Sequence, residues 1–208
     1  MIVQWCIKGM SLLDDNTARS IIDDRGGIVS NWWREVGTIS PQERRDKLTP
    51  ANLDMHVNHY TSTDPVTGKT FDKITPFISL SAGNVSRDAV ARTNTVQAAR
   101  HTALWFGTEF GTRTKAYLYI CWVPLAPRQA VEIEGMAEEV RDLNTYRRYS
   151  SFQTEGEITA KVDIPDNQIQ ACEKWEYDRP ARRLRRSWVH PNPRFTLPEQ
   201  LSNVRELI

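Results

Sequence analysis

Hydrophobic and polar residues alternate most strictly in the segment 152–162. Its even-numbered positions are mostly apolar, and its odd-numbered positions are all polar. Such alternation predicts a half-buried strand whose side chains point alternately to two faces. Glu155 and Glu157 would then share one face, roughly 6–7 Å apart along the strand. Because Glu is depleted in strands and like charges repel, the pair is a candidate functional feature, although a solvated strand face has the same pattern.

The first 50 residues predict a helical N-terminal extension. A short helix is expected between the candidate cap Asn16 and the glycines at 26–27. A second helix follows a capping box at residues 40–43, which has proline at the first helical position. We therefore divide the chain into a helical extension, residues 1–50, and a larger unit, residues 51–208, which includes a basic C-terminal tail.

From about residue 54 the pattern becomes typical of strands. Besides the alternating segment, strands are expected at residues 55–62, 77–81, 117–123, 131–133 and 169–177. A helix is expected over 86–106, where apolar residues form one stripe, and a short final helix over 201–207. Because only one long helix lies among the strands, the pattern predicts an α+β fold rather than alternating βαβ units.

The composition is that of an ordinary globular chain, with 208 residues, 39% of them hydrophobic and 25% charged, and a net charge of +1. The charge is uneven, since residues 179–186 contain five arginines and no acid. Three widely spaced cysteines, no signal-peptide pattern and no apolar run of about 18 residues predict a cytoplasmic protein without a membrane partner. The four histidines lack a metal-ligand spacing, so no metal is expected, and the chain has neither a Rossmann nor a P-loop glycine motif.

Polar residues recur at related places in three of the expected strands. They are His59, Tyr60, Thr61, Ser79, Ser81, Glu155 and Glu157. The two serines form a Ser-x-Ser pattern, and Glu157 closes a Glu-x-Glu pattern seven residues before an Ile-Pro pair. In order and spacing these segments resemble the cholera/pertussis-toxin-like branch of the mono-ADP-ribosyltransferase superfamily, over roughly residues 55–172.

The resemblance implies an ADP-ribosyltransferase-like split antiparallel β-sheet core with flanking helices, and it makes residues 51–208 the catalytic domain. It also implies NAD as a substrate and no metal. Glu157, Glu155 and Ser79 would be catalytic: Glu157 would stabilise the positive charge that develops on the ribose, and Ser79 would orient it. The residues that bind NAD would be His59, Tyr60, Thr61, Ser79 and Ser81.

His59 departs from the branch that the other motifs resemble. That branch has arginine at this position, whereas histidine is usual in the diphtheria-toxin and poly-ADP-ribose-polymerase branch. A neutral histidine has one donor and one acceptor, which suits ribose hydroxyls better than phosphate. His56 is an alternative for the same role, and the residues that bind the pyrophosphate stay open.

Two features of the sequence point to different acceptors. In the family, Glu at the first position of the Glu-x-Glu motif usually accompanies arginine targets, so Glu155 favours a protein arginine. Arginines interleaved with aromatic residues favour a nucleic-acid base, through phosphate contacts and stacking. The expected acceptor-binding residues are Glu155, Tyr149, Phe152, Arg147, Arg148, Arg182 and Arg183.

The expected activity is therefore transfer of ADP-ribose from NAD to a macromolecule, either protein or RNA/DNA, by a toxin or effector. A small transferase of this kind also resembles the toxins of toxin–antitoxin and phage-defence systems, which makes an inhibitor or antitoxin protein a further candidate partner. Two alternatives stay open. One is an NAD glycohydrolase, in which water is the acceptor, and the other is a non-catalytic module that binds NAD or nucleic acid on the same fold.

Overall fold

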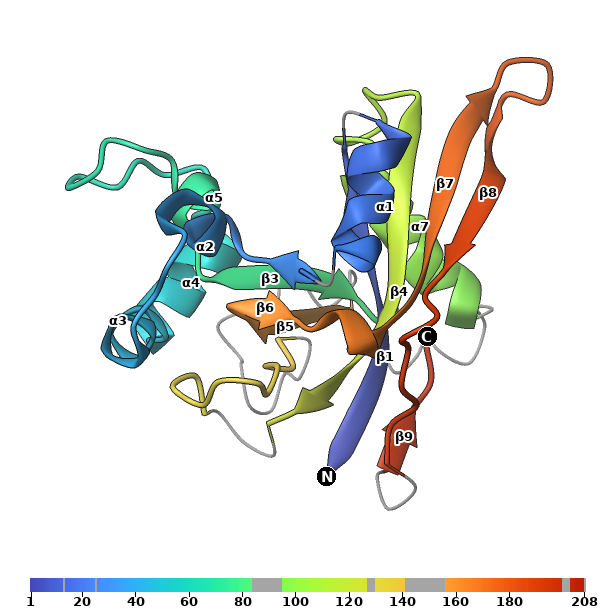
Figure 1. Cartoon of the computed structure of the whole chain (residues 1–208). Helices are drawn as coiled ribbons and strands as arrows, with labels where there is room; N and C mark the ends of the chain where they lie inside the picture. The colour runs from blue at the N-terminus through green and yellow to red at the C-terminus, as the bar shows by residue number, and fades with distance from the viewer. Residues whose placement is uncertain are drawn as a thin grey trace.

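The computed structural model describes residues 1–12, 14–24, 26–83, 95–126, 130–140, 156–199 and 203–207. In this part of the chain seven strands form one sheet in the order β5-β3-β1-β4-β7-β8, with β9 beside β1 (Figure 1). The strands are β1 (Ile2–Met10), β3 (Phe77–Ser81), β4 (Lys115–Leu125), β5 (Glu157–Lys161), β7 (Ile169–Asp178), β8 (Arg183–Pro191) and β9 (Asn203–Arg205). Only the β1–β9 pair among them is parallel. Strands β2 (Ile28–Val29) and β6 (Asp163–Ile164) form a small second sheet.

The described helices surround the sheet in two groups. They are α1 (Asp15–Asp23), α2 (Asn31–Val36), α3 (Pro41–Lys47), α4 (Pro50–Asn58), α5 (Phe71–Ile74) and α7 (Thr95–Gly107), with a 3-10 turn, η2 (Asp166–Gln168). Helices α2 to α5 gather beside β3, away from the long strands (Figure 1). Helices α1 and α7 cover opposite faces of β4, because Tyr119 packs with Ala18 of α1 and Leu118 packs with Ala103 of α7.

The first strand corrects the expected helical N-terminal extension. Residues 2–10 form β1, which pairs with β4 along its whole length, whereas the helices expected near 16–26 and after the capping box do form. Val3, Cys6 and Ile7 of β1 are fully buried. A strand buried on both faces has no clean alternation, which is why periodicity did not reveal it.

A second correction concerns the strand expected at residues 55–62. This segment is the end of α4 followed by a turn. Thr49 caps the helix by accepting from the Asn52 N–H, and proline occupies the first turn. Leu53 and Val57, four residues apart, are its buried positions. The capping signal at the helix start therefore outweighs the β-like composition that follows.

The remaining expectations for secondary structure are partly confirmed and partly wrong. Strands expected at 77–81, 117–123 and 169–177 are confirmed by β3, β4 and β7. The short strand expected at 131–133 is wrong, because this segment is a turn. The final helix expected over 201–207 is also wrong for the residues that the structure describes, because residues 203–205 form strand β9. The basic tail is not a loose segment either: residues 179–186 form the tip and the outer strand of the β7–β8 hairpin (Figure 1).

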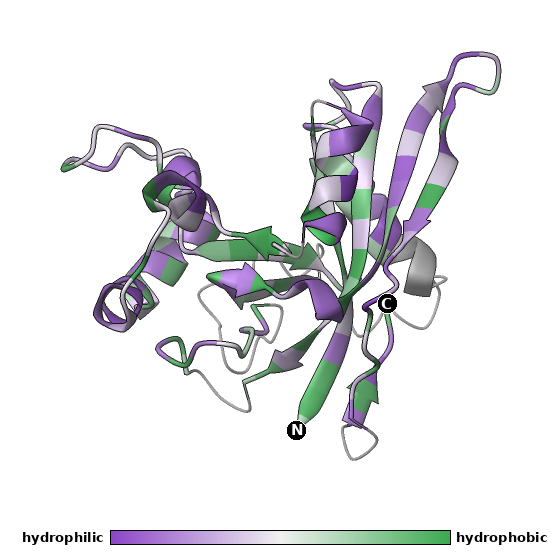
Figure 2. Ribbon diagram, in the orientation of Figure 1, coloured by the Kyte–Doolittle hydropathy of each residue, from purple (hydrophilic) through white to green (hydrophobic). Residues whose placement is uncertain are grey.

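The sheet is apolar at its centre and polar along this hairpin (Figure 2). Helix α7 lies directly on β1 at Gly9, where a Cβ atom would come within 1.9 Å of the Ala103 carbonyl oxygen. Only glycine allows this approach, which brings the end of α7 to the end of β1. No helix among the described residues is long and apolar enough to cross a membrane.

Candidate functional site

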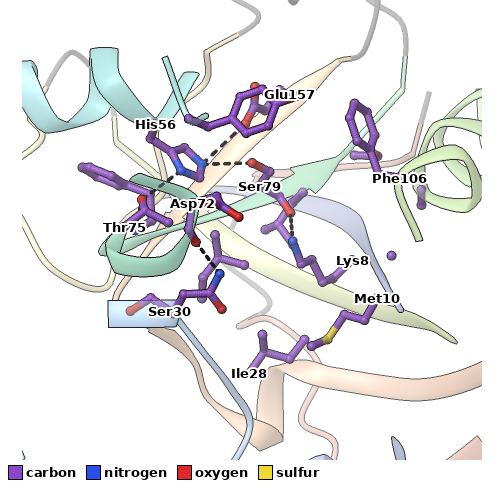
Figure 3. Close-up of a pocket in the computed structure, with 18 of the residues that line it drawn as sticks. Lys8, Met10, Ile28, Ser30, His56, Asp72, Thr75, Ser79, Phe106 and Glu157 are labelled. Atoms are coloured by element: carbon purple, nitrogen blue, oxygen red, sulfur yellow. Dashed lines mark hydrogen bonds and ion pairs between the residues drawn. The ribbon is translucent and has the colours of Figure 1, made fainter. Parts of the chain in front are cut away.

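A cavity of about 370 Å³ lies where the sheet divides, between β1 and the β3–β5 pair. Strands β1 and β3 pair only at Ile7 and Ser81, so beyond that point they separate. The cavity has Lys8 from β1, His56 from α4, Ser79 from β3 and Glu157 from β5 in its wall, and the end of α7 at one side (Figure 3). Residues from both ends of the sequence therefore meet in one place.

Glu157 is the first residue of β5, and it is 7% exposed. The β3–β5 register places it opposite Ser81, and it places Thr159 opposite Ser79, so all four side chains share one face of the pair. The Thr159 hydroxyl donates to Glu157 Oε1 over 3.3 Å. Because this carboxylate is buried, the solvated strand face that the alternating pattern also allowed does not apply to it.

The turn before Glu157 is held by a close approach of two glycines. Gly156 has φ of +58°, and a Cβ atom there would lie 1.3 Å from the Gly83 carbonyl oxygen. The Ala82 N–H donates to the Gly156 oxygen over 2.9 Å, next to the end of β3. These constraints fix the point at which the chain enters β5, and with it the position of Glu157.

His56 lies between two hydroxyls, that of Thr75 just before β3 and that of Ser79 within β3. Its Nδ1 is 2.9 Å from Thr75 Oγ1, its Nε2 is 2.9 Å from Ser79 Oγ, and the same Nε2 is 3.9 Å from Glu157 Oε1 (Figure 3). Burial, reinforced by the charge of Lys8, lowers the pKa of His56 to about 3. The ring is therefore neutral at physiological pH, with one donor and one acceptor.

The hydrogen bonds around Thr75 are consistent with a neutral His56 that carries its proton on Nε2. The Phe77 N–H donates to Thr75 Oγ1 over 3.2 Å and takes one of the two acceptor positions of this oxygen. We assign the Thr75 hydroxyl proton to His56 Nδ1, which leaves the proton of the ring on Nε2. That N–H then faces Ser79 and Glu157, inside the cavity.

Lys8 supplies a cation to the same cavity. Its Nζ donates to the Ser79 carbonyl oxygen over 3.0 Å, which ties β1 to β3 beyond their single paired position. Burial lowers the pKa of Lys8 to about 8, and the nearby Glu157 opposes that shift. The side chain is therefore mostly protonated at neutral pH, and it places a positive charge where an anionic ligand would fit.

The sequence missed Lys8 because residues 1–50 were assigned to a peripheral extension. The available signal was a single lysine directly after residues 2–7, which are apolar except for Gln4. Such a run is typical of a strand, and a charge at its end is typical of a residue at the edge of a core. The pairing of β1 with β3 and β4 is what brings Lys8 into the wall of the cavity.

The structure brings together part of the expected site. Ser79, Ser81, Tyr60 and Glu157 line the cavity, as does His56. His59 and Thr61 are exposed in the turn after α4, and neither is among the described residues that line the cavity. The histidine at the centre of the cavity is thus His56, the alternative considered above, because the segment is a helix and not a strand.

Of the acceptor-binding residues expected from the sequence, five lie outside the described part of the chain and two lie on the β7–β8 hairpin. Glu155, Tyr149, Phe152, Arg147 and Arg148 lie outside the described residues. Arg182 and Arg183 are exposed at the tip of the β7–β8 hairpin. Strand β8 is at the opposite edge of the sheet from β5, so these two arginines lie far from the cavity (Figure 1).

Comparison with known proteins gives structural matches only. No protein-family model and no curated protein matches the sequence. Among solved structures, EcPltA is 13% identical, with a TM-score of 0.55, and the match covers 99% of this chain and 94% of that chain. A double mutant of heat-labile enterotoxin is 16% identical (TM-score 0.45; 91% and 62% covered), and full-length CARDS toxin is 15% identical (TM-score 0.45; 100% and 32% covered).

The chain thus spans less than two thirds of the enterotoxin and CARDS toxin chains, but nearly all of EcPltA. At this identity the likeness to EcPltA concerns the fold. The mixed architecture, with one large antiparallel sheet and few helices, confirms the α+β class expected from the sequence. This chain has the fold of the ADP-ribosyltransferase toxins, such as PltA.

Proposed function

We propose that the protein is an NAD-dependent mono-ADP-ribosyltransferase that transfers ADP-ribose from NAD to a macromolecule and releases nicotinamide. One observation carries this proposal: a buried carboxylate, Glu157, lies beside neutral His56 and Ser79 in a cavity with a cation, Lys8, in its wall. The fold supports the same assignment. It is the combination on this fold, and not any one residue, that favours this chemistry.

The reaction breaks the bond between C1′ of the ribose and the nicotinamide nitrogen. The electron pair of that bond leaves with nicotinamide, and the ribose passes through an oxocarbenium-like state, as in glycoside hydrolysis. A carboxylate held in a site with little water stabilises this cation more than a solvated one would. We assign that role to Glu157, and the strand pairing and the Thr159 hydroxyl that hold it in the buried wall of the cavity support the assignment.

The neighbouring residues suit the other parts of the nucleotide. The Nε2–H of His56 faces Ser79 Oγ, so we expect a ribose hydroxyl to bind beside this hydrogen bond, at the Ser79 and Ser81 hydroxyls on the same face. Tyr60 lies at the mouth of the cavity, where its ring would cover the nicotinamide. Lys8 is the candidate for the pyrophosphate, for which the sequence offered no residue, since an ammonium group binds phosphate as a compact charge.

The acceptor completes the reaction by attacking C1′ and giving up a proton. We assign the acceptor side to Glu155, which would accept that proton or orient a guanidinium nucleophile. Because the β7–β8 hairpin lies at the other edge of the sheet, Arg182 and Arg183 would hold a remote part of a large acceptor and not its reacting atom. This division fits a macromolecule, either a protein or a nucleic acid, and an inhibitor or antitoxin would compete for the same surfaces.

The test is transfer of label from NAD to whole-cell lysate, followed by protease, RNase or DNase to identify the class of acceptor. Glu157→Gln keeps size and hydrogen bonding but removes the charge, so transfer should fall by about 100-fold or more while folding is unchanged. Glu199→Gln, an exposed position outside the cavity, is the matched control. Near-normal transfer by Glu157→Gln would refute the assignment, and free ADP-ribose without a labelled macromolecule would identify a glycohydrolase.

A further inference from the structure

Helix α2 turns one face toward the cavity, and this face carries an arginine. Asn31 and Arg34 line the cavity, as does the cap residue Ser30, whereas Trp32 between them is buried. Residues three positions apart are neighbours on one face of a helix, so Asn31 and Arg34 face the cavity together. Arg34 from α2 and Lys8 from β1 therefore belong to the wall of the same cavity, which Figure 3 shows with Ser30 and Lys8 labelled.

Hydrogen bonds to two segments around the cavity fix the position of α2. The Ser30 N–H donates over 2.7 Å to the oxygen of Val162, directly after β5. The Asn31 side-chain nitrogen donates over 2.6 Å to the main-chain oxygen of Asp72 in α5. The Arg34 N–H donates to the Ser30 oxygen over 3.1 Å, within the helix. The backbone that carries Arg34 is thus held in place relative to the cavity, although the side chain itself is exposed.

The guanidinium group of Arg34 has donors to spare for a ligand. Among the described residues, its side-chain hydrogen bond goes from Nη1 to Asn31 Oδ1, at a long 3.5 Å, and it has no carboxylate partner there. Asp72, whose carboxylate also lines the cavity, is paired with Lys73 instead, with Oδ2 and Nζ 3.1 Å apart. Because a guanidinium has five N–H donors, Arg34 can bind an anion without first giving up an ion pair within the described part of the chain.

The charges of Arg34 and Lys8 act on each other in the cavity. Burial lowers the pKa of Lys8 to about 8, Glu157 and Cys121 oppose this shift, and the positive charge of Arg34 adds to it. The pKa of His56 is lowered to about 3 by burial, so its ring adds no charge at neutral pH. Two like charges that face one cavity repel each other, and an anion bound by both would relieve this repulsion. The pair therefore suits a ligand with two neighbouring negative charges.

We propose that Arg34 and Lys8 together bind the pyrophosphate of the dinucleotide. The inference rests on the proposed function, because it takes NAD as the ligand. A guanidinium group can bind two phosphate oxygens at once with its planar fork, whereas an ammonium group acts as a compact charge. Arg34 thus sets the orientation of the pyrophosphate, and Lys8, which is tied to the Ser79 oxygen, holds it near β3.

The test measures binding of ADP-ribose, inorganic pyrophosphate and nicotinamide riboside to the whole protein by calorimetry. Arg34→Gln should weaken the binding of ADP-ribose and of pyrophosphate by about tenfold, and it should leave the binding of nicotinamide riboside, which has no phosphate, unchanged. Arg34→Lys keeps the charge without the fork, so it should recover part of the loss. Thermal melting confirms that each variant is folded.

Arg45→Gln is the matched control. Arg45 is also exposed, and its Nη2 also donates to the side-chain amide oxygen three residues earlier, that of Gln42, over 2.9 Å. It lies on α3 and is not among the described residues that line the cavity. This variant should therefore bind all three ligands as the wild type does.

The pH dependence of ADP-ribose binding provides a second measurement. In the wild type, affinity should fall as the pH rises through about 8, because Lys8 then loses its charge. Arg34→Gln removes a charge that lowers the pKa of Lys8, so the fall should move to higher pH, whereas Arg45→Gln should leave it in place. A residue that acts only on folding would not move it.

Wild-type affinity for ADP-ribose and pyrophosphate in Arg34→Gln would overturn the inference. An equal loss of nicotinamide riboside binding, or a fall in affinity at the same pH as in the wild type, would also overturn it. NAD cleavage with an unchanged KM in Arg34→Gln would refute the role of Arg34 and leave the proposed function standing. ADP-ribose binding that depends on Arg34 and Lys8, in a protein unable to cleave NAD, would support the phosphate site and refute the proposed function.

Discussion

A buried ion pair on β5, four residues along the strand from Glu157, gives the sharpest prediction for stability. Lys161 of β5 and Glu138 are both fully buried, with Nζ and Oε1 2.7 Å apart. The same Nζ donates to the carbonyl oxygens of Ala130 (2.6 Å) and Ile133 (2.9 Å). Burial raises the pKa of Glu138 and lowers the pKa of Lys161, and the pair opposes both shifts. Three acceptors around one nitrogen require the three protons of an ammonium group, so the lysine is charged.

Lys161→Met removes this charge and leaves the buried carboxylate of Glu138 with no cation, and with the Ala130 N–H as the donor to its Oε1 (3.3 Å). Its Oε2 lacks a hydrogen-bond partner among the described residues, so one neutral N–H donor is left to balance a buried negative charge. Breaking a buried pair in this way costs about 3–5 kcal/mol, a large part of the roughly 5–15 kcal/mol that holds a domain folded. In urea, with a slope of about 2 kcal/mol per molar, the unfolding midpoint should fall by roughly 2 M. Tryptophan fluorescence during urea unfolding measures this shift.

The double variant Lys161→Met with Glu138→Leu separates the lost charge pair from the lost packing. Because it leaves no charge buried, it should recover at least half of the free energy of unfolding, and the rest reflects carbonyl oxygens that lose a donor. The single variant should also lower kcat, since the main chain of Glu138 pairs with Thr159, whose hydroxyl donates to Glu157. A loss below about 1 kcal/mol for Lys161→Met, or a double variant no more stable than the single one, would refute this reasoning.

Two further predictions concern β1. Because the pKa of Lys8 is about 8, its charge is present below that pH and is lost above it, so the KM for NAD should rise as pH increases from 7 to 9. Lys8→Met should have a KM for NAD about tenfold higher than that of the wild type, and this KM should not change between pH 7 and 9. If the variant shows the same rise in KM with pH, the rise belongs to another group. Gly9→Ala places a Cβ atom 1.9 Å from the Ala103 oxygen and should cost about 1–3 kcal/mol, measured as a lower thermal midpoint. An unchanged midpoint would contradict the close packing of α7 on β1.

The parts of the site that the sequence predicts are those defined by neighbouring residues on a strand. Alternation singled out the segment that contains Glu157, and the resemblance carried by the Ser-x-Ser and Glu-x-Glu patterns implied Ser79, Ser81 and Glu157; the β3–β5 register places all three on one face. Alternation gave the faces correctly but not their burial, since Lys161 on the polar face is buried against residues 130–138. Pattern alone does not reveal a polar face that other segments cover.

The parts that the sequence does not predict depend on distant pairing or on a choice between two local structures. Lys8 becomes part of the site only because β1 lies between β3 and β4. These strands are more than 70 and more than 100 residues away from β1 in the sequence. His56 and His59 differ by less than one helical turn, and the choice between them followed from expecting a strand where Thr49 and Pro50 start a helix. Local propensity was outweighed here by capping and by burial of the helix face.

The division of the sheet is what makes a site on this fold possible. Strand β1 runs with β4 along nine paired positions but meets β3 at only one, so the two halves diverge and leave the cavity between them. Such an opening would expose strand edges unless side chains close it, and Lys8 does so by donating to the free Ser79 carbonyl. The same ammonium group that closes the gap is then the charge facing an anionic ligand. Structure and proposed binding thus depend on one residue, which is why Lys8→Met must be tested by ligand binding and pH profile and not by activity alone.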